Sequence, residues 1–234
     1  MYTDIHSHVI WGVDDGAEER EDTFRMLRAA AADGISTIIC TPHVTPGVYE
    51  FPEETFREHF AEAEEYIREN GLGITLHTGA EILYTDYMSR FLREKKVMTL
   101  AGSSYVLVEF LPTDTKDHIY DALQKVANSG YRPVIAHMER YPAIRTLDQV
   151  REMKSRFHAL VQINCRSLIR KQPLLRRSFF DGLFREDLAD FIGTDTHAFP
   201  GRETCMTESM KALAEKYGRN TAERIEKKPE IILK

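Results

Sequence analysis

The chain has 234 residues, of which 42% are hydrophobic and 29% charged, and its formal net charge is −6 at pH 7. This length suits a single domain over residues 1–234 with a sizeable core. The net negative charge argues against nucleic acid as a partner, because proteins that bind the phosphate backbone are usually basic. The chain shows no secretory leader and no apolar run of about 18 residues, and its three cysteines are scattered. We therefore expect a cytoplasmic protein that is not inserted in a membrane.

Short apolar β runs alternate with amphipathic helical runs along the chain. The predicted strands are 2–8, 36–41, 74–82, 105–110, 133–137, 159–164 and 190–194. The predicted helices are 18–33, 52–69, 87–94, 117–128, 147–157, 174–184, 204–217 and 221–227. Such alternation implies parallel strands in right-handed βαβ units. Since no GxGxxG or P-loop motif follows any strand, we predict an α/β fold with a parallel βα barrel, seven-stranded and distorted. An open doubly wound sheet is the alternative.

The first predicted strand ends in His6 and His8, which project to the same face because side chains of a strand alternate. Neutral imidazole is the commonest metal ligand among side chains. A lone His-x-His pair is a weak signal, since surface and core pairs are about as common. Six of the seven predicted strand ends, however, carry His, Asp or Glu. Active sites of βα barrels lie at this end of the strands, so a shared site is expected there.

The candidate metal ligands are His6, His8, Asp15, His43, Glu81, Glu109, His137, Asp195 and His197. Their mixture of imidazole and carboxylate without thiolate favours Mn, Fe or Zn. Nine ligands are too many for one ion, whereas two or three ions with bridging carboxylates would use them all. Clustered ions of this kind generate a hydroxide nucleophile at neutral pH and stabilise the oxygens of an in-line phosphoryl displacement.

Each ligand also has an ordinary structural interpretation. Asp15 could carry the N-terminal charge of a helix, and Glu109 could be half of a buried pair. His43 or His137 alone would more often be a hydrogen-bonded core histidine. The company of the other candidates favours metal binding for all of them. Four further histidines fall in helices or away from strand ends and are assigned structural roles: His59, His77, His118 and His158.

Two arginines lie next to the candidate ligands. Arg140 follows the fifth strand end, and Arg202 lies five residues after His197, in a predicted turn with Pro200 and Gly201. A planar guanidinium group matches phosphate oxygens in bidentate fashion. Most arginines of the chain are expected on the surface, but the position of these two beside the ligands favours a catalytic role in phosphate binding.

These motifs resemble the polymerase and histidinol phosphatase (PHP) superfamily. Within it, they are most similar to the manganese-dependent bacterial protein tyrosine phosphatases of capsule and exopolysaccharide operons. The resemblance covers essentially the whole chain, and residues 4–16, 79–82 and 137–141 are specific to that branch. Glu109 fits the same branch, since several relatives with small substrates carry histidine there. The loop 44–51 lacks the basic or histidine-rich character of some members, so no substrate contact is carried over to it.

The resemblance implies a metal-dependent tyrosine phosphatase with manganese as its cofactor. Its implied substrate is a phosphotyrosine protein, namely a bacterial tyrosine kinase that regulates capsule or exopolysaccharide synthesis. The implied metal sites are three: His6, His8, Glu81 and Asp195; Asp15, His43 and His197; and Glu109 and His137 with Glu81 as the bridge.

The residues themselves exclude the usual chemistry of tyrosine phosphatases. A cysteine nucleophile needs Cys-x5-Arg, but Pro46, Lys171 and Lys211 stand six residues after the three cysteines. The predicted nucleophile is therefore a hydroxide on the metal ions.

Three other functions stay open at this stage. One is a PHP phosphatase of a small phosphomonoester such as histidinol phosphate. Another is a phosphodiesterase of the exonuclease type, which the net acidity and the lack of a basic stripe disfavour. The third is a metal-binding regulatory domain without turnover. The sequence carries no signal for the oligomeric state.

Overall fold

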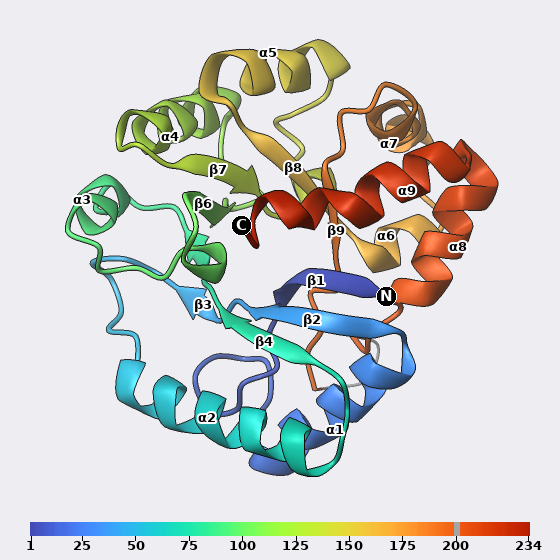
Figure 1. Cartoon of the computed structure of the whole chain (residues 1–234). Helices are drawn as coiled ribbons and strands as arrows, with labels where there is room; N and C mark the ends of the chain where they lie inside the picture. Colours follow the sequence, from blue (N-terminus) through green and yellow to red (C-terminus); the bar gives the residue numbers. More distant parts are fainter. Residues whose placement is uncertain (199–201) are drawn as a thin grey trace.

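The computed structural model describes residues 1–198 and 202–234, and helices surround a curled parallel sheet in it (Figure 1). The strands are β1 (Tyr2–Ser7), β2 (Ile35–Cys40), β3 (His43–Val44), β4 (Thr75–Thr78), β5 (Glu81–Leu83), β6 (Tyr105–Glu109), β7 (Arg132–Ile135), β8 (Leu160–Asn164) and β9 (Phe191–Gly193). The α-helices are α1 (Arg20–Ala32), α2 (Glu53–Glu69), α3 (Met88–Arg93), α4 (Lys116–Asn128), α5 (Leu147–Phe157), α6 (Cys165–Ile169), α7 (Leu174–Arg185), α8 (Met206–Tyr217) and α9 (Arg219–Lys227). Short 3-10 helices are η1 (Leu100–Gly102), η2 (Met138–Arg140) and η3 (Lys228–Ile231).

The sheet has two sections, with the strand orders β1-β2-β4 and β3-β5-β6-β7-β8-β9, and each paired strand is parallel to its neighbour. Beyond β9, the N–H of Asp195 donates to the carbonyl of His6 at 2.8 Å. The N–H of His8 donates in turn to the carbonyl of Thr196 at 3.1 Å. These bonds bring the last strand beside the first, so the sheet curls into a half-barrel. In Figure 1, four helices lie outside the curl: α1 and α2 beside β2 and β4, and α4 and α5 on the opposite part of the ring, beside β7 and β8.

The predicted parallel βα architecture is confirmed in this form, but the count of seven strands is not, since the described residues form nine. The predicted strand 74–82 is divided into β4 and β5, which belong to different sections. The division falls at Gly79, where a Cβ atom would lie 2.8 Å from Cγ2 of Ile39. Before Gly79 the chain pairs with β2, and after it the chain pairs with β3 and β6. The two-residue strand β3 and the five-residue helix α6 were not predicted. All predicted helices are confirmed, with slightly different ends.

The two faces of the curled sheet pack in different ways. Between the sheet and the helices lies a large apolar cluster, to which every long helix contributes. Inside the curl lies a smaller one, made of Ile5, Ile39, Leu100, Tyr105, Leu107, Val134, Ala136, Phe191 and Ile232. Ile232 belongs to the C-terminal segment, which crosses the strands in Figure 1. Among the described residues, no helix has the length and apolar character that a bilayer span requires.

A bulge in β1 determines where its histidines point. Asp4 pairs with Ile38 and Ser7 with Cys40, so three steps along β1 match two steps along β2. The extra residue changes the alternation of the strand. Ile5 joins the inner apolar cluster, and the next residue, His6, also directs its ring into the interior. Bulges commonly re-aim side chains beside functional sites in this way.

A buried ion pair fixes the entry to β9, far from the carboxyl ends of the strands. The carboxylate of Asp190 is 5% exposed, accepts the N–H of Val161 at 3.0 Å and pairs with Lys154 of α5. The ammonium of Lys154 also donates to the carbonyl of Leu188 at 3.1 Å. Burial lowers the pKa of Lys154, although the charge of Asp190 acts in the opposite direction.

We expect Asp190→Asn to lower the free energy of unfolding by about 3 kcal/mol, since breaking one side of a buried pair leaves the other charge without its partner. Urea denaturation followed by circular dichroism would measure this loss. Replacing the ammonium as well, in Asp190→Asn/Lys154→Met, should recover part of it. Lys211→Met is the matched control, because its ion pair with Glu215 is exposed and worth at most about 1 kcal/mol. Equal stability of Asp190→Asn and Lys211→Met would contradict this role.

Candidate metal centre

All nine predicted ligands converge at the carboxyl ends of the strands. They come from β1 and the loop after it (His6, His8, Asp15), from β3, β5 and β6 (His43, Glu81, Glu109), and from the turns after β7 and β9 (His137, Asp195, His197). Three groups have ligand atoms within 4.8 Å of one another: His8, Asp15, His43 and His197; His6, His8 and Glu81; and His43, Glu81 and Glu109. The groups overlap, so they form one continuous cluster.

The carboxylate of Glu81 is the centre of this cluster. Its Oε2 lies 3.1 Å from Nε2 of His6, 3.2 Å from Nε2 of His8 and 3.2 Å from Nδ1 of His43. Its Oε1 lies 2.9 Å from Nε2 of His137. The residue is fully buried. Burial alone would raise the pKa of Glu81, but the surrounding histidines outweigh it and hold that pKa well below its usual value.

The donor atoms of this cluster fit a cation. Nδ1 of His8 lies 2.7 Å from Oδ2 of Asp14, and Nδ1 of His6 lies 3.1 Å from Oε1 of Gln162. Both oxygens only accept, so each Nδ1 carries a proton. The two Nε2 atoms are 3.2 Å apart and both face Glu81. If both rings are neutral, each Nε2 carries a lone pair, and the two lone pairs point at each other and at a carboxylate. A shared metal ion stabilises such an arrangement.

The other buried histidines are held in a similar way. Nδ1 of His197 donates to the backbone carbonyl of Asp195 at 3.1 Å. Nδ1 of His137 lies 3.2 Å from the hydroxyl of Tyr141, which accepts the N–H of Phe110 at 3.1 Å. In each ring the opposite nitrogen is thereby left for the cluster. Fixing one ring nitrogen sets the orientation and the tautomer of the ligand at the other.

The residues that hold the ligands were not predicted from the sequence. Gln162 also accepts the N–H of His137 at 2.7 Å, and Nδ2 of Asn164 donates to Oδ2 of Asp195 at 2.7 Å. A signal for both was present, because Gln162 and Asn164 alternate with apolar residues in a strand whose two faces are buried. Polar residues at such positions need a partner inside the protein.

Asp14 also holds a candidate ligand in place, although only its neighbour Asp15 was predicted from the sequence. Besides His8, it accepts the N–H of Gly16 at 2.9 Å and the N–H of His43 at 3.0 Å. Burial opposes its ionisation, but the bond with His8 and these N–H groups prevail and lower the pKa of Asp14 to about 2. A Cβ atom on Gly16 would lie 2.2 Å from the carbonyl oxygen of His8, so the turn requires glycine.

The charge balance of the cluster differs between its two sides. Burial opposes protonation of His137, but hydrogen bonds with Glu109 and Glu81 prevail and raise the pKa of His137 to about 9. Burial and the nearby charge of His8 instead lower the pKa of His197 to about 4. The carboxylates of Glu81 and Glu109 therefore stabilise positive charge beside His137, and a metal ion would supply that charge.

Arg140 and Arg202 meet at the carboxylate of Asp195. Nη2 of Arg140 lies 2.8 Å from Oδ2, and Nη2 of Arg202 lies 2.5 Å from Oδ1. Their side chains are 47% and 29% exposed, whereas that of Asp195 is 3% exposed. Both guanidinium groups thus lie at the opening of the cluster, between the ligands and solvent. The predicted turn at Pro200 and Gly201 lies outside the described residues.

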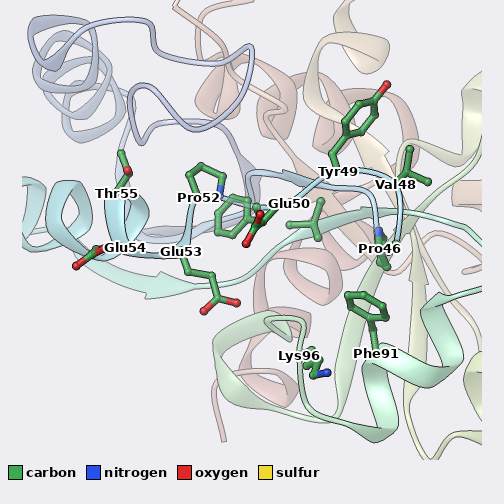
Figure 2. Close-up of a pocket in the computed structure, with 13 residues that line it drawn as sticks. Pro46, Val48, Tyr49, Glu50, Pro52, Glu53, Glu54, Thr55, Phe91 and Lys96 are labelled. Atoms are coloured by element: carbon green, nitrogen blue, oxygen red, sulfur yellow. The ribbon is translucent and has the colours of Figure 1, made fainter.

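An open groove of about 1000 Å³ begins at Val44, the residue after His43. Its walls come from residues 44–55, which run from the end of β3 through a loop into the first turn of α2, and from α3 and the residues after it. Figure 2 shows Pro46 of the loop above Phe91 of α3, with Lys96 beside Phe91. The hydroxyl of Thr85 fixes the loop by donating to the carbonyl of Pro46 at 2.8 Å. The loop to which the resemblance assigned no contact therefore forms a groove next to a candidate ligand.

Comparison with known proteins places this site in a family. The model for capsular polysaccharide synthesis proteins CpsB/CapC matches residues 2–234. The tyrosine-protein phosphatase CpsB of Streptococcus pneumoniae is 30% identical over 233 residues, which cover 95% of this chain and 93% of the relative. The tyrosine-protein phosphatase YwqE of Bacillus subtilis is 28% identical over 241 residues, which cover 99% of this chain and 91% of the relative.

Solved structures agree with the sequence comparison. A chain from the crystal structures of YwqE from Bacillus subtilis and CpsB from Streptococcus pneumoniae, described as unique metal-dependent tyrosine phosphatases, has a TM-score of 0.87 at 27% identity and covers 99% of this chain and 94% of that chain. A histidinol phosphate phosphatase from Lactococcus lactis, solved with zinc, L-histidinol and phosphate, has a TM-score of 0.59 at 18% identity, with coverages of 93% and 94%, and shares the fold. The resemblance drawn from the sequence is confirmed, and the chain belongs to the CpsB/CapC family of capsular polysaccharide synthesis proteins.

Proposed function

We propose that this protein is a metal-dependent protein tyrosine phosphatase, which hydrolyses the phosphate monoester of phosphotyrosine. The observation that carries the proposal is the arrangement around Glu81, where imidazoles and carboxylates converge beneath two partly exposed arginines. The names of the CpsB and YwqE relatives support the same activity. No Cys-x5-Arg motif is present, so the chemistry differs from that of cysteine-dependent phosphatases.

We assign the metal ligands to three sites that share Glu81. The first would use His6, His8, Glu81 and Asp195, the second Asp15, His43 and His197, and the third Glu81, Glu109 and His137. Nitrogen and carboxylate donors without thiolate suit manganese, with iron or zinc as alternatives. Bound divalent cations would supply the acidity that makes water a nucleophile at neutral pH and the charge that stabilises phosphoryl oxygens.

The protein's own contribution is to bind and orient the phosphate. A phosphotyrosine monoester carries between about −1.5 and −2 charges at pH 7. Arg140 and Arg202 present two guanidinium groups at the same edge of the cluster, so both can grip its non-bridging oxygens. These contacts gain strength as charge develops on the oxygens in the transition state. Asn164 keeps Asp195 in place by its hydrogen bond while the arginines turn to the substrate.

A substrate panel tests the activity. We expect a phosphotyrosine peptide to be hydrolysed faster than histidinol phosphate or a phosphodiester, with manganese the most effective metal and with activity lost in a chelator. Elemental analysis of the active protein should find more than one ion per chain. Bound ions without hydrolysis of any phosphoester would instead identify a regulatory metal-binding domain, and a preference for histidinol phosphate would identify a small-molecule phosphatase.

Substitution of the arginines should change turnover, whereas substitution of the residues that hold the ligands should change metal affinity. Arg140→Ala and Arg202→Ala should each slow turnover by roughly a hundred-fold, because one charge-assisted contact in the transition state is worth about 2–4 kcal/mol. Their metal content should equal that of the parent, since arginine is no metal ligand. Loss of metal from Arg140→Ala, or parental turnover in both variants, would contradict phosphate binding by these residues.

Asp14→Asn provides the opposite case. The amide keeps the size of the carboxylate but turns one acceptor into an N–H group, which would face the N–H donors of His8, Gly16 or His43. We expect metal affinity to fall about ten- to a hundred-fold, as for other residues that orient ligands. Competition with a metal indicator would measure it.

The groove beside His43 is suited to the polypeptide around the phosphotyrosine. Its loop exposes Val48 and Tyr49, which are 55% and 75% exposed and offer apolar contacts to an extended chain. Glu50 and Glu53 line the same groove and favour basic residues in the substrate. Because the groove begins one residue after the candidate ligand His43, we propose that the residues beside a phosphotyrosine at the cluster reach this wall.

We therefore expect Tyr49→Ala to raise KM for a phosphotyrosine peptide several-fold while leaving hydrolysis of p-nitrophenyl phosphate unchanged. A small aryl phosphate reaches the cluster but not the groove. Leu175→Ala is the control, because Leu175 is also exposed but lies outside the groove. Parallel changes for both substrates, or none for the peptide, would remove the groove from substrate binding.

The natural substrate we propose is a bacterial tyrosine kinase that controls capsule or exopolysaccharide synthesis. The family's role in capsular polysaccharide synthesis supports this assignment. Deletion of the gene should raise phosphotyrosine on that kinase, measured by immunoblot, and re-expression of the parent but not of Arg140→Ala should reverse it. Unchanged kinase phosphorylation would direct attention to other phosphoproteins.

A further inference from the structure

Two cysteines that are distant in the sequence lie side by side outside the metal centre. Cys165 is the first residue of α6, and Cys205 directly precedes α8. Helix α6 packs against α8, and Ser209 of α8 contacts both cysteines. The hydroxyl of Ser209 donates to the carbonyl of Cys165 at 2.8 Å and lies 3.7 Å from Sγ of Cys205. The packing of α6 against α8 therefore creates a thiol pair.

The two thiols differ in access. Cys165 is fully buried, and its Sγ lies 3.6 Å from Sδ of Met206. Cys205 is partly exposed. An oxidant from solvent therefore reaches Cys205 first, because Cys165 is shielded from solvent.

The two thiols also differ in acidity. The hydrogen bond from Cys165, with further help from Ser209 and Arg166, lowers the pKa of Cys205 to about 7 against the effects of burial and of Asp33. The N-terminus of the twelve-residue helix α8 adds its dipole to the same side. Burial raises the pKa of Cys165 well above its usual value. A low-pKa, accessible cysteine next to a second cysteine is the common arrangement of redox-sensitive sites.

We propose that Cys165 and Cys205 are a modification site, at which a hydroperoxide converts the two thiols into a reversible disulfide. The thiolate of Cys205 attacks one peroxide oxygen, the O–O bond breaks, and the other oxygen leaves as an alcohol, or as water from hydrogen peroxide, after taking up a proton. The sulfur of Cys165 then attacks the sulfenic acid. The S–S bond forms as the S–O bond breaks, and the oxygen leaves as water with the proton of the second thiol. The thiols lose two electrons, which the peroxide gains.

This disulfide would join two segments that reach the metal centre. Asn164, which donates to Asp195, directly precedes Cys165. Arg202, which pairs with Asp195, lies three residues before Cys205. A disulfide bond of about 2.05 Å is shorter than any non-bonded contact between two sulfur atoms, so its formation draws the two segments together. Shifts of about 1 Å in positioning residues can cost up to a hundred-fold in rate. Oxidation should therefore slow phosphotyrosine hydrolysis, an effect that rests on the proposed function.

Mass spectrometry of the metal-loaded full chain tests the modification. After treatment with hydrogen peroxide and proteolysis without reductant, we expect a peptide that links residues 165 and 205, lighter by two hydrogens and released by dithiothreitol. Cys205→Ser should yield no linked peptide. Cys165→Ser should accumulate a sulfenic acid at Cys205, trapped by a 1,3-dione probe. Cys40→Ser is the control and should behave like the parent, since Cys40 is fully buried in β2 and its pKa is raised by burial.

A linked peptide that contains Cys40, or oxidation of Cys205→Ser as fast as the parent, would overturn the proposal. So would a parent without the linked peptide at a peroxide dose that oxidises Cys205 to sulfinic acid. Thermal unfolding of each variant shows that the chain is folded.

Activity separates this proposal from the proposed function. The parent should lose about ten-fold or more of its hydrolysis rate on oxidation and regain it in dithiothreitol, whereas Cys205→Ser should keep its rate. A disulfide that forms in a protein inactive on phosphotyrosine would overturn the proposed function and leave the modification site standing. A disulfide that forms without a change in rate would overturn its link to the metal centre.

Discussion

A single buried carboxylate, Glu81, organises the functional end of this protein. A charge removed from water is costly unless charged or hydrogen-bonding partners surround it. Four imidazoles lie around Glu81, and three of their contacts converge on one oxygen. Such a cluster is compact only if positive charge balances it, which is why the same geometry suits divalent cations. The curled sheet serves this constraint, because the ends of β1, β3, β6, β7 and β9 bring histidines and carboxylates to the one carboxylate on β5.

The backbone accepts local strain to bring the ligands to this point. His137 and Asp195, two candidate ligands, have φ angles of 28° and 50°, in a region that residues other than glycine seldom adopt. Each such residue costs about 1–3 kcal/mol and persists only where the surroundings hold it. Gln162 binds the backbone N–H of His137, and Asn164 binds the carboxylate of Asp195. Both holding residues come from β8, so one strand maintains two strained turns.

The sequence predicted which residues gather at the strand ends, but it did not predict how they are held. Strand ends follow from runs of apolar residues, and parallel strands must place their carboxyl ends together, so the placement of His43 and Glu109 beside the other candidates could be predicted. The bulge in β1 could not be, because it depends on the register between β1 and β2. The division of strand 74–82 depends likewise on strand pairing, since β4 pairs with β2 whereas β5 pairs with β3 and β6. Long-range contacts of this kind leave little trace in local residue patterns.

Asp195 connects the metal centre to the substrate side of the site. Its carboxylate faces His6 and His8 at 3.7 Å on one side and receives both arginines on the other. A phosphate that pairs with both arginines would remove two positive partners from Asp195. Cations in the cluster would then balance the charge of Asp195. If the cluster binds metal and the arginines bind phosphate as proposed, metal binding would favour release of the arginines to the phosphate. Phosphate binding would in turn favour retention of the metals, since linkage between two ligands is reciprocal. The same carboxylate would thus make the arginines sensitive to the metals although they bind none.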